Sequence, residues 1–260
     1  ALFQAVFLRS IITVPPVLLM VWVAKVTLRD LAKQDIRLIW LRVGAEICTT
    51  IAFLTALKYM PLANVTAILQ ALPLAVTMAA ALFLAEPIGW RRWSAILVGF
   101  MGVLIVVRPG LDGFNVYSLS ALAAIIFITV REIATRKLAQ EVPTITVVLS
   151  TAIGSAVFAG IMMVGAEWHA VSTSSWLLLI VAAFAVLIAT LLSVMAMRTG
   201  EIGFVSPFRY TSMLGAIGLG ILMFGEWPDQ PTLAGTVIIV MTGIYTFHRE
   251  QKISRGVTAG

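Results

Sequence analysis

Charge is scarce in this chain of 260 residues. Only 12% of the residues are Asp, Glu, Lys or Arg, whereas 60% are hydrophobic and the mean hydropathy is +1.02. A soluble domain averages about a quarter charged residues, because its surface must be wetted. So few charges cannot cover a water-facing surface. This scarcity excludes a soluble globular protein and indicates one that lies in the lipid bilayer.

Cysteine, histidine and catalytic motifs are also scarce. The single cysteine, Cys48, excludes an internal disulfide and makes a cysteine metal site unexpected. The two histidines, His169 and His248, fall at the ends of apolar segments, where interfacial residues are expected rather than ligands. A G-x-S-x-G motif, a P-loop, a paired-aspartate motif and a His–Asp cluster are all missing from the sequence. We therefore expect no metal, no cofactor, no enzymatic activity and no direct use of ATP.

Long apolar runs make up most of the chain. A membrane-spanning helix needs about 20 mainly apolar residues, and nine runs of roughly this kind are separated by short connections. We predict spans at 2–24, 38–57, 62–84, 93–107, 118–138, 144–165, 175–197, 202–224 and 232–247. The connections leave no room for a soluble catalytic domain. The sequence thus predicts an all-α, multi-pass membrane protein.

The basic residues fall into alternate connections. One set of connections holds twelve of them: Lys25, Arg29, Lys33, Arg37, Arg91, Arg92, Arg136, Lys137, Arg198, Arg249, Lys252 and Arg255. The other set holds only Lys58 and Arg108. Because cytoplasmic loops are enriched in Lys and Arg, we expect a cytoplasmic C-terminus and residue 1 on the outside. The net charge of +6 thus reflects orientation and not binding of nucleic acid.

The architecture of the first half of the chain repeats in the second half. The segment "LFLAEP" ends one span at Glu86, and "LMFGEW" ends another at Glu226. We call the alignment that matches Glu86 with Glu226 the repeat alignment. In it, the loop with Arg91 and Arg92 corresponds to a loop that holds Asp229 and no basic residue. Equivalent loops therefore lie on opposite sides of the membrane, which is typical of an inverted-topology repeat.

Inversion requires an odd number of helices in each half. Five predicted spans follow Tyr117, but only four precede it. We therefore expect that one helix before residue 1 belongs to the complete protein, giving ten spans in two inverted five-helix repeats, nine of which are present here. The expected repeats are residues 1–110 and residues 111–260, the latter with a cytoplasmic tail.

Several motifs carry a family resemblance. The chain resembles the EamA branch of the drug/metabolite transporter superfamily in its two halves and in four motifs. These motifs are "LAEP" and "FGEW" at the ends of the fourth helices of the halves, "VFLR" at 6–9 and "SPFRYTSML" at 206–214. The resemblance covers essentially the whole chain. It implies a bacterial inner-membrane protein that moves small organic metabolites, amino-acid-like, vitamin-like or nucleoside-like, by alternating access around a midplane cavity.

Two predicted spans combine a helix breaker with polar residues. Pro207 precedes Arg209 and Tyr210, and Pro73 follows Gln70 in the corresponding span of the first half. Interrupted helices in equivalent places of two halves indicate a transporter binding site. We expect Arg209, Tyr210 and Gln70 to contact the substrate. Alternatively, Arg209 extends to the interface to reach water, and the other two bond to neighbouring helices.

Further charges lie inside spans. Arg42 and Glu46 are one helical turn apart, so they can pair, either to join helices or to serve gating or proton coupling. Arg131 is a weaker candidate for substrate contact. Glu132 has favourable spacing to Arg136 for a surface pair. Arg9 of "VFLR" is a third candidate for gating or coupling.

Another class of function stays open. A non-transporting membrane scaffold or sensor also needs apolar helices, but it has no need of interrupted helices in both halves. Glycines on lipid-facing surfaces would permit a homodimer. The substrate, the direction of transport and its coupling to ions do not follow from the sequence.

Overall fold

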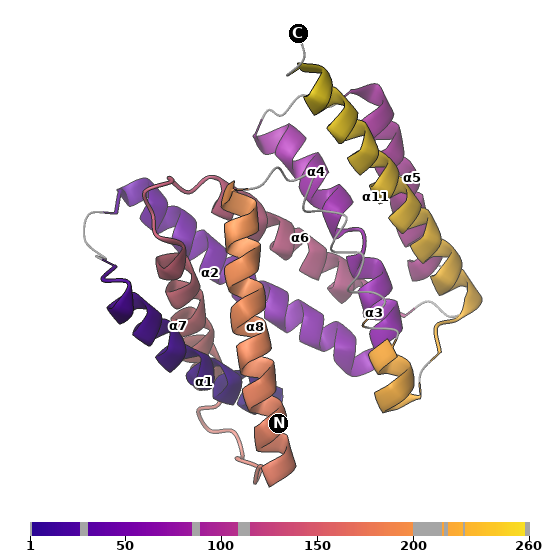
Figure 1. Cartoon of the computed structure of the whole chain (residues 1–260). Coiled ribbons are helices and arrows are strands. Elements are labelled where there is room, and N and C mark those ends of the chain that lie inside the picture. Colours follow the sequence, from indigo (N-terminus) through magenta and orange to yellow (C-terminus); the bar gives the residue numbers. More distant parts are fainter. Residues whose placement is uncertain are drawn as a thin grey trace. The chain divides into compact units, whose positions relative to one another are not determined.

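The computed structural model describes residues 2–26, 31–84, 89–108, 115–199, 215, 218–225 and 227–257. Every regular element in these ranges is a helix (Figure 1), which confirms the all-α prediction. The helices are α1 (Leu2–Val23), α2 (Lys33–Tyr59), α3 (Leu62–Leu69), α4 (Leu72–Phe83), α5 (Trp90–Val107), α6 (Ser118–Arg136), α7 (Thr144–Met162), α8 (Thr173–Thr199), the π-helical turn η2 (Gly220–Phe224) and α11 (Gln230–Val257). Most of the predicted span 202–224 lies outside the described residues.

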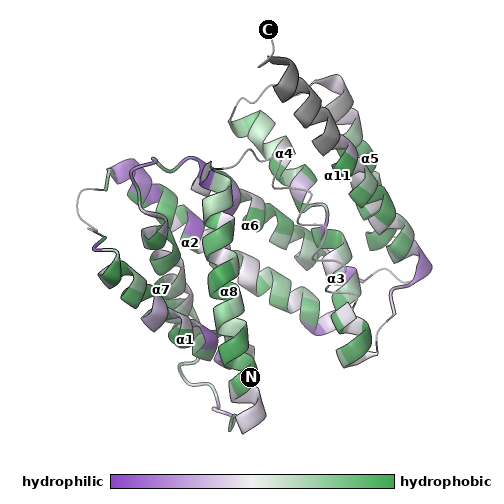
Figure 2. Ribbon diagram, in the orientation of Figure 1, coloured by the Kyte–Doolittle hydropathy of each residue, from purple (hydrophilic) through white to green (hydrophobic). Residues whose placement is uncertain are grey.

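The helices have the length and the surface of membrane spans. Six helical segments are long and apolar enough to cross a bilayer, counting α3 and α4 together as Leu62–Phe83. Two shorter apolar helices, Trp93–Val107 and Gln230–Tyr245, match the predicted runs 93–107 and 232–247. Large apolar side chains such as Trp22, Val164 and Leu222 are more than three-quarters exposed. Figure 2 shows hydrophobic residues along nearly the full length of most helices. Surfaces this apolar require lipid.

The chain divides into two compact units. The first unit comprises Ala1–Ile47 and Val130–Thr199, and the second comprises Cys48–Thr129 and Gly200–Gly260. Helices α2 and α6 contribute residues to both units. Each unit thus combines segments from both halves of the chain.

Helix boundaries repeat along the sequence. In the repeat alignment both ends of α8 match the ends of α2, and the two helices have the same length of 27 residues. The first residue of α11 likewise matches the first residue of α5. This agreement extends the predicted repeat from the sequence to the secondary structure.

In the first unit, α1 packs against α7 with the opposite chain direction (Figure 1). The rings of Phe3 and Phe158 meet edge to face with 6.2 Å between centroids. Beyond them, the side-chain amide of Gln4 donates to the carbonyl of His169 over 2.8 Å. At the other end of α1, Val17 lies in a core cluster with Val147. The start of α1 therefore lies beside the end of α7.

In the second unit, α5 packs against α11, again antiparallel (Figure 1). A Cβ atom on Gly102 would lie 2.8 Å from the carbonyl oxygen of Gly235, so the two backbones touch. Arg108 at the end of α5 forms an ion pair with Asp229, just before α11. In the repeat alignment α1 corresponds to α7 and α5 to α11. Corresponding helices of an inverted repeat run in opposite directions, as both pairs do here.

Arg198 fixes the connection between α6 and α7 in the first unit. Its guanidinium donates to the carbonyl oxygens of Ala139, Gln140 and Val142 and to the hydroxyl of Thr144. Three of these acceptors lie in the connection itself, and Thr144 is the first residue of α7. One side chain from α8 thus holds the connection between α6 and α7 and the start of α7 in place.

The close backbone contact between α5 and α11 predicts that a larger side chain at Gly235 destabilises the protein. Gly235→Ala would place a Cβ 2.6 Å from the carbonyl oxygen of Gly102, and the rigid backbone has no room to yield. We expect a loss of stability on the order of 1–3 kcal/mol, measured as a lower unfolding temperature in detergent. The control is Gly44→Ala on α2, whose added Cβ has no neighbour within 4 Å. Equal unfolding temperatures for the two variants would contradict the packing.

The contacts of Asp229 with Arg108 and Thr232 predict that loss of its carboxylate destabilises the protein. Burial alone would raise the pKa of the Asp229 carboxyl, but hydrogen bonds from Thr232 and Arg108 outweigh it and lower the pKa below its ordinary value of 3.8. The carboxylate also caps α11, because it accepts from the Thr232 backbone N–H over 3.0 Å. Asp229→Ala should lower the free energy of unfolding by about 1 kcal/mol at neutral pH, the typical contribution of an N-cap residue.

The sign of the pH effect follows from the lowered pKa. The contribution of Asp229 is complete above the pKa of the unfolded chain and is lost as the pH falls through the lower pKa of the folded protein. The difference in unfolding temperature between wild type and Asp229→Ala should therefore shrink in strong acid. Asp229→Asn keeps the cap and should lose less at neutral pH. A difference that grows on acidification would refute this assignment.

Candidate functional site

Five charged side chains gather inside the first unit. They are Arg9 from α1, Arg42 and Glu46 from α2, and Arg131 and Glu132 from α6, and we call them the charged cluster. All five lie within helices long and apolar enough to span a membrane. Ionised groups at such positions are costly unless they are paired or face an internal, polar cavity. Within the cluster, Arg131 is paired with both carboxylates, whereas Arg42 and Arg9 have no carboxylate at hydrogen-bond distance among the described residues.

Arg131 binds two carboxylates at once. Its Nη1 lies 2.6 Å from Oε2 of Glu46, and its Nη2 lies 2.8 Å from Oε1 of Glu132. The planar guanidinium presents donors in a fixed fork, which suits two acceptors on different helices. The side chains of Arg131 and Glu46 are 18% and 19% exposed, and that of Glu132 only 3%. This fork links α2 to α6.

Arg42 contacts hydroxyl groups. It is 2% exposed, its Nε donates to Thr135 Oγ1 over 2.9 Å, and its Nη1 donates to the hydroxyl of Thr151. The one-turn spacing predicted a pair between Arg42 and Glu46. The structure instead gives Glu46 the guanidinium of Arg131, which reaches it from a neighbouring helix. Arg42 still lies close enough to Glu46 for electrostatic attraction.

Glu132 corrects one expectation from the sequence. Its spacing to Arg136 predicted a surface pair, but the residue is 2% exposed and therefore buried. Its carboxylate accepts from Arg131 and, over 3.4 Å, from the hydroxyl of Ser193 on α8. Arg136 donates to the carbonyl of Met197. A signal was present, because Arg131 and Glu132 are adjacent opposite charges well inside an apolar span.

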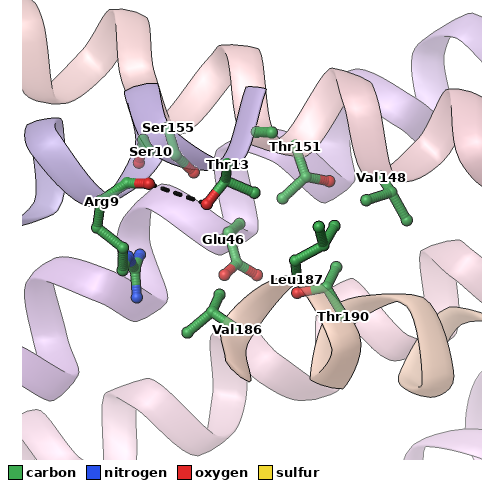
Figure 3. Close-up of a pocket in the computed structure, with 11 residues that line it drawn as sticks. Arg9, Ser10, Thr13, Glu46, Val148, Thr151, Ser155, Val186, Leu187 and Thr190 are labelled. Carbon is green, nitrogen blue, oxygen red and sulfur yellow. Dashed lines mark hydrogen bonds between the residues drawn. The ribbon is translucent and has the colours of Figure 1, made fainter. Parts of the chain in front are cut away.

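A small polar pocket borders the cluster (Figure 3). Its volume is about 30 Å³, and Arg9, Ser10, Thr13, Glu46, Val148, Thr151, Ala152, Ser155, Val186, Leu187 and Thr190 line it. Drug-sized ligands occupy pockets of roughly 300–1,000 Å³. In this conformation the pocket has room for a water molecule or one small polar group, and not for a whole metabolite.

Arg9 has a distinct place in the pocket. Its backbone carbonyl accepts from Thr13 Oγ1 over 2.9 Å, the dashed line in Figure 3. Its guanidinium has no hydrogen-bond acceptor among the described residues, although it lies within electrostatic range of Glu46. Among the described residues, Arg9 is therefore the cluster member whose whole guanidinium lacks a hydrogen-bond acceptor.

Gln70 and Pro73 lie at an interruption in the second unit. Helix α3 ends at Leu69 and α4 begins at Leu72, with Pro73 in its first turn. Proline lacks a backbone N–H and disfavours helix before it, so the break falls ahead of Pro73. Gln70, 3% exposed, caps the end of α3. Pro207, Arg209 and Tyr210 lie outside the described residues.

Removing the shared guanidinium should destabilise the protein strongly. Arg131→Met removes the guanidinium that buried Glu132 shares with partly buried Glu46, and the loss of one member of a buried ion pair typically costs about 3–5 kcal/mol. Glu46→Gln should cost less, because Arg131 keeps Glu132. The unfolding temperatures in detergent of both variants and of Lys137→Gln, at an exposed position, check this order. A milder effect of Arg131→Met than of Glu46→Gln would contradict it.

Among the residues that the structure describes, no three His, Cys, Asp or Glu side chains are grouped to hold a metal ion. The charged cluster alternates cations and anions. Its chemistry is therefore that of charge pairing and of hydrogen bonding to small polar groups.

Comparison with known proteins gives this arrangement a context. A solved structure is similar over 94% of this chain and 87% of its own, with a TM-score of 0.71 and 20% identity, which supports the fold alone. A riboflavin transporter of Vibrio cholerae is 30% identical over 83% of this chain and 72% of its own length.

Two further relatives are also transporters. An S-adenosylmethionine uptake transporter of Rickettsia conorii is 26% identical over 75% of this chain, and the match spans about two thirds (66%) of that protein. A pseudopaline exporter of Pseudomonas aeruginosa is 26% identical over 93% of this chain and 84% of its own length. The sequence profile of the EamA-like transporter family matches residues 1–108 and again residues 116–247. The chain belongs to the EamA-like transporter family.

Proposed function

We propose that this protein is a secondary transporter of small organic metabolites that works by alternating access. One observation carries the proposal: a membrane-embedded helical bundle of this family holds five ionised side chains in its interior, beside a polar pocket. Buried charges in a membrane protein typically mark a pathway for substrates or ions. A scaffold or sensor has no need of them.

The relatives support the class of cargo. Their names specify riboflavin, S-adenosylmethionine and pseudopaline, which are moved inward in one case and outward in another. The shared class is a small organic metabolite. Since the relatives are transporters, we infer that this chain is also a transporter and not an enzyme.

The repeat supports the mechanism. We propose that residues 1–110 and 111–260 form two oppositely inserted halves, in line with the two separate matches to the family and the antiparallel pairs α1–α7 and α5–α11. Rocking of such halves alternately opens a central site to each side of the membrane. We place the protein in a bacterial inner membrane with its C-terminus in the cytoplasm, on the basis of its basic loops.

Two groups of residues have separate proposed roles. Arg209, Tyr210 and Gln70, which combine donors and acceptors, would contact the substrate. Arg42, Glu46 and Arg9 would serve gating or coupling. Arg131, a candidate for substrate contact from the sequence, would join them, because a guanidinium shared by two carboxylates can exchange one partner for another. Such an exchange gives the bundle two discrete arrangements, as alternating access requires.

Transport in proteoliposomes tests the proposal. We expect the purified chain to move labelled riboflavin or S-adenosylmethionine across the membrane and to show counterflow, in which internal unlabelled substrate accelerates uptake. Glu46→Gln should lower the rate at least tenfold, because it removes one of the two carboxylates that share Arg131. The matched control is Lys137→Gln on an exposed position of the first unit.

The comparison of variants separates a coupling role from a structural one. Glu46→Gln protein should insert and remain monodisperse, as shown by size-exclusion chromatography. Rates equal to wild type in this variant would remove the cluster from the mechanism. Absence of transport of either compound, together with absence of binding, would favour the scaffold alternative.

A further inference from the structure

The predicted spans hold an excess of positive charge. At least four residues from either end of a span, the sequence contains four arginines, Arg9, Arg42, Arg131 and Arg209, against two glutamates, Glu46 and Glu132. The charged cluster in the described part of the chain shows the same imbalance, with three guanidiniums and two carboxylates. A buried cation without a counter-charge is unfavourable in a bilayer. Among the described residues, the cluster is therefore short of one negative charge.

The contacts of the five side chains show where the excess positive charge of the cluster lies. Both carboxylates accept from Arg131, which uses one terminal nitrogen for each. Arg42 is held by two hydroxyl groups, which are neutral and do not offset its charge. Arg9 has no acceptor for its guanidinium among the described residues. The unmatched charge thus lies on the side of the cluster that faces the pocket.

The pocket supplies further donors. The hydroxyls of Thr13 and Thr151 donate to backbone carbonyls, so their protons are already used. The hydroxyls of Ser10, Ser155 and Thr190 have no hydrogen-bond partner in the part of the chain that the structure describes, so their O–H groups are available. Arg9 and three hydroxyl donors around one small space form a built site for oxygen acceptors.

Charge and size together select the ligand. A cation in the pocket would meet the guanidinium of Arg9, and Glu46, the carboxylate that lines the pocket, already binds Arg131. A volume of about 30 Å³ admits one small group and not a whole metabolite. We propose that the pocket beside Arg9 binds the carboxylate group of a carboxylate-bearing metabolite, with Arg9 as the anion-binding residue. This inference rests on the proposed transport function and names the chemical class of its substrate.

Binding of a minimal carboxylate tests the inference without any transport. The probe is isotopically labelled acetate, added to the purified full chain in detergent at constant ionic strength and observed by NMR line broadening. Acetamide, which has the same shape without the charge, is the matched control probe. We expect saturable broadening of acetate and at least tenfold weaker binding of acetamide.

Variants assign the binding to the pocket. Arg9→Gln should weaken acetate binding at least tenfold, while Arg9→Lys, which keeps the charge but loses the fork, should retain part of it. Ser155→Ala removes one pocket hydroxyl and should weaken binding by a few fold. Lys137→Gln removes one positive charge at an exposed position and should leave acetate binding unchanged.

The outcomes are decisive in both directions. Equal binding of acetate and acetamide to the wild type, or no acetate binding at all, would overturn the inference even if Arg9→Gln failed to fold. Unchanged acetate binding in folded Arg9→Gln would overturn it as well. Riboflavin transport without acetate binding would leave the proposed function intact and remove only this inference. Arg9-dependent acetate binding without transport of any compound would keep the anion site and reject the transporter.

Discussion

A guanidinium inside a membrane-spanning helix is stable only where its charge is compensated, and Arg131 meets this condition with two carboxylates at once. Glu46 and Glu132 both depend on it, because an ionised carboxylate in an apolar interior is costly unless a cation compensates it. The fork connects α2 to α6, and Ser193 extends the network to α8. The packing of the first unit therefore requires that this cluster stays together.

The apolar parts of the structure follow a different rule. Lipid surrounds the helices, so burying apolar surface gives little drive for helix association, and close backbone contact and polar links matter more. Gly102 and Gly235 bring α5 and α11 into contact, and Arg108 and Asp229 close the end of that pair. Phe3, Phe158 and Gln4 do the same for α1 and α7. Both pairs join corresponding helices of the two halves, so the repeat is also the principle of packing.

These two features suggest how a rigid bundle can move. Antiparallel, symmetry-related pairs can tilt without unfolding, because each pair keeps its own contacts. The charged cluster has more donors than carboxylates, so a bound anion or an exchange of partners changes which helices it holds together. An anionic substrate beside Arg9 would complete the charge balance, which links occupancy of the site to the arrangement of α1, α2 and α6.

The sequence by itself determined the helical, membrane-spanning class, the repeat that relates the two halves and the presence of charged residues inside the spans. Apolar runs are long enough to be read directly, and the matching lengths of α2 and α8 follow the repeat alignment. The interruption near Pro73 was also readable, since proline acts through the local backbone. The partners of the charges were not. Spacing along a helix pointed Arg42 to Glu46 and Glu132 to the surface, whereas the structure placed Arg131 between both glutamates and buried Glu132. Spacing along the chain fixes only which residues share a face of one helix. The packing of α1, α2, α6 and α8 against one another decides which charged side chains from different helices become partners.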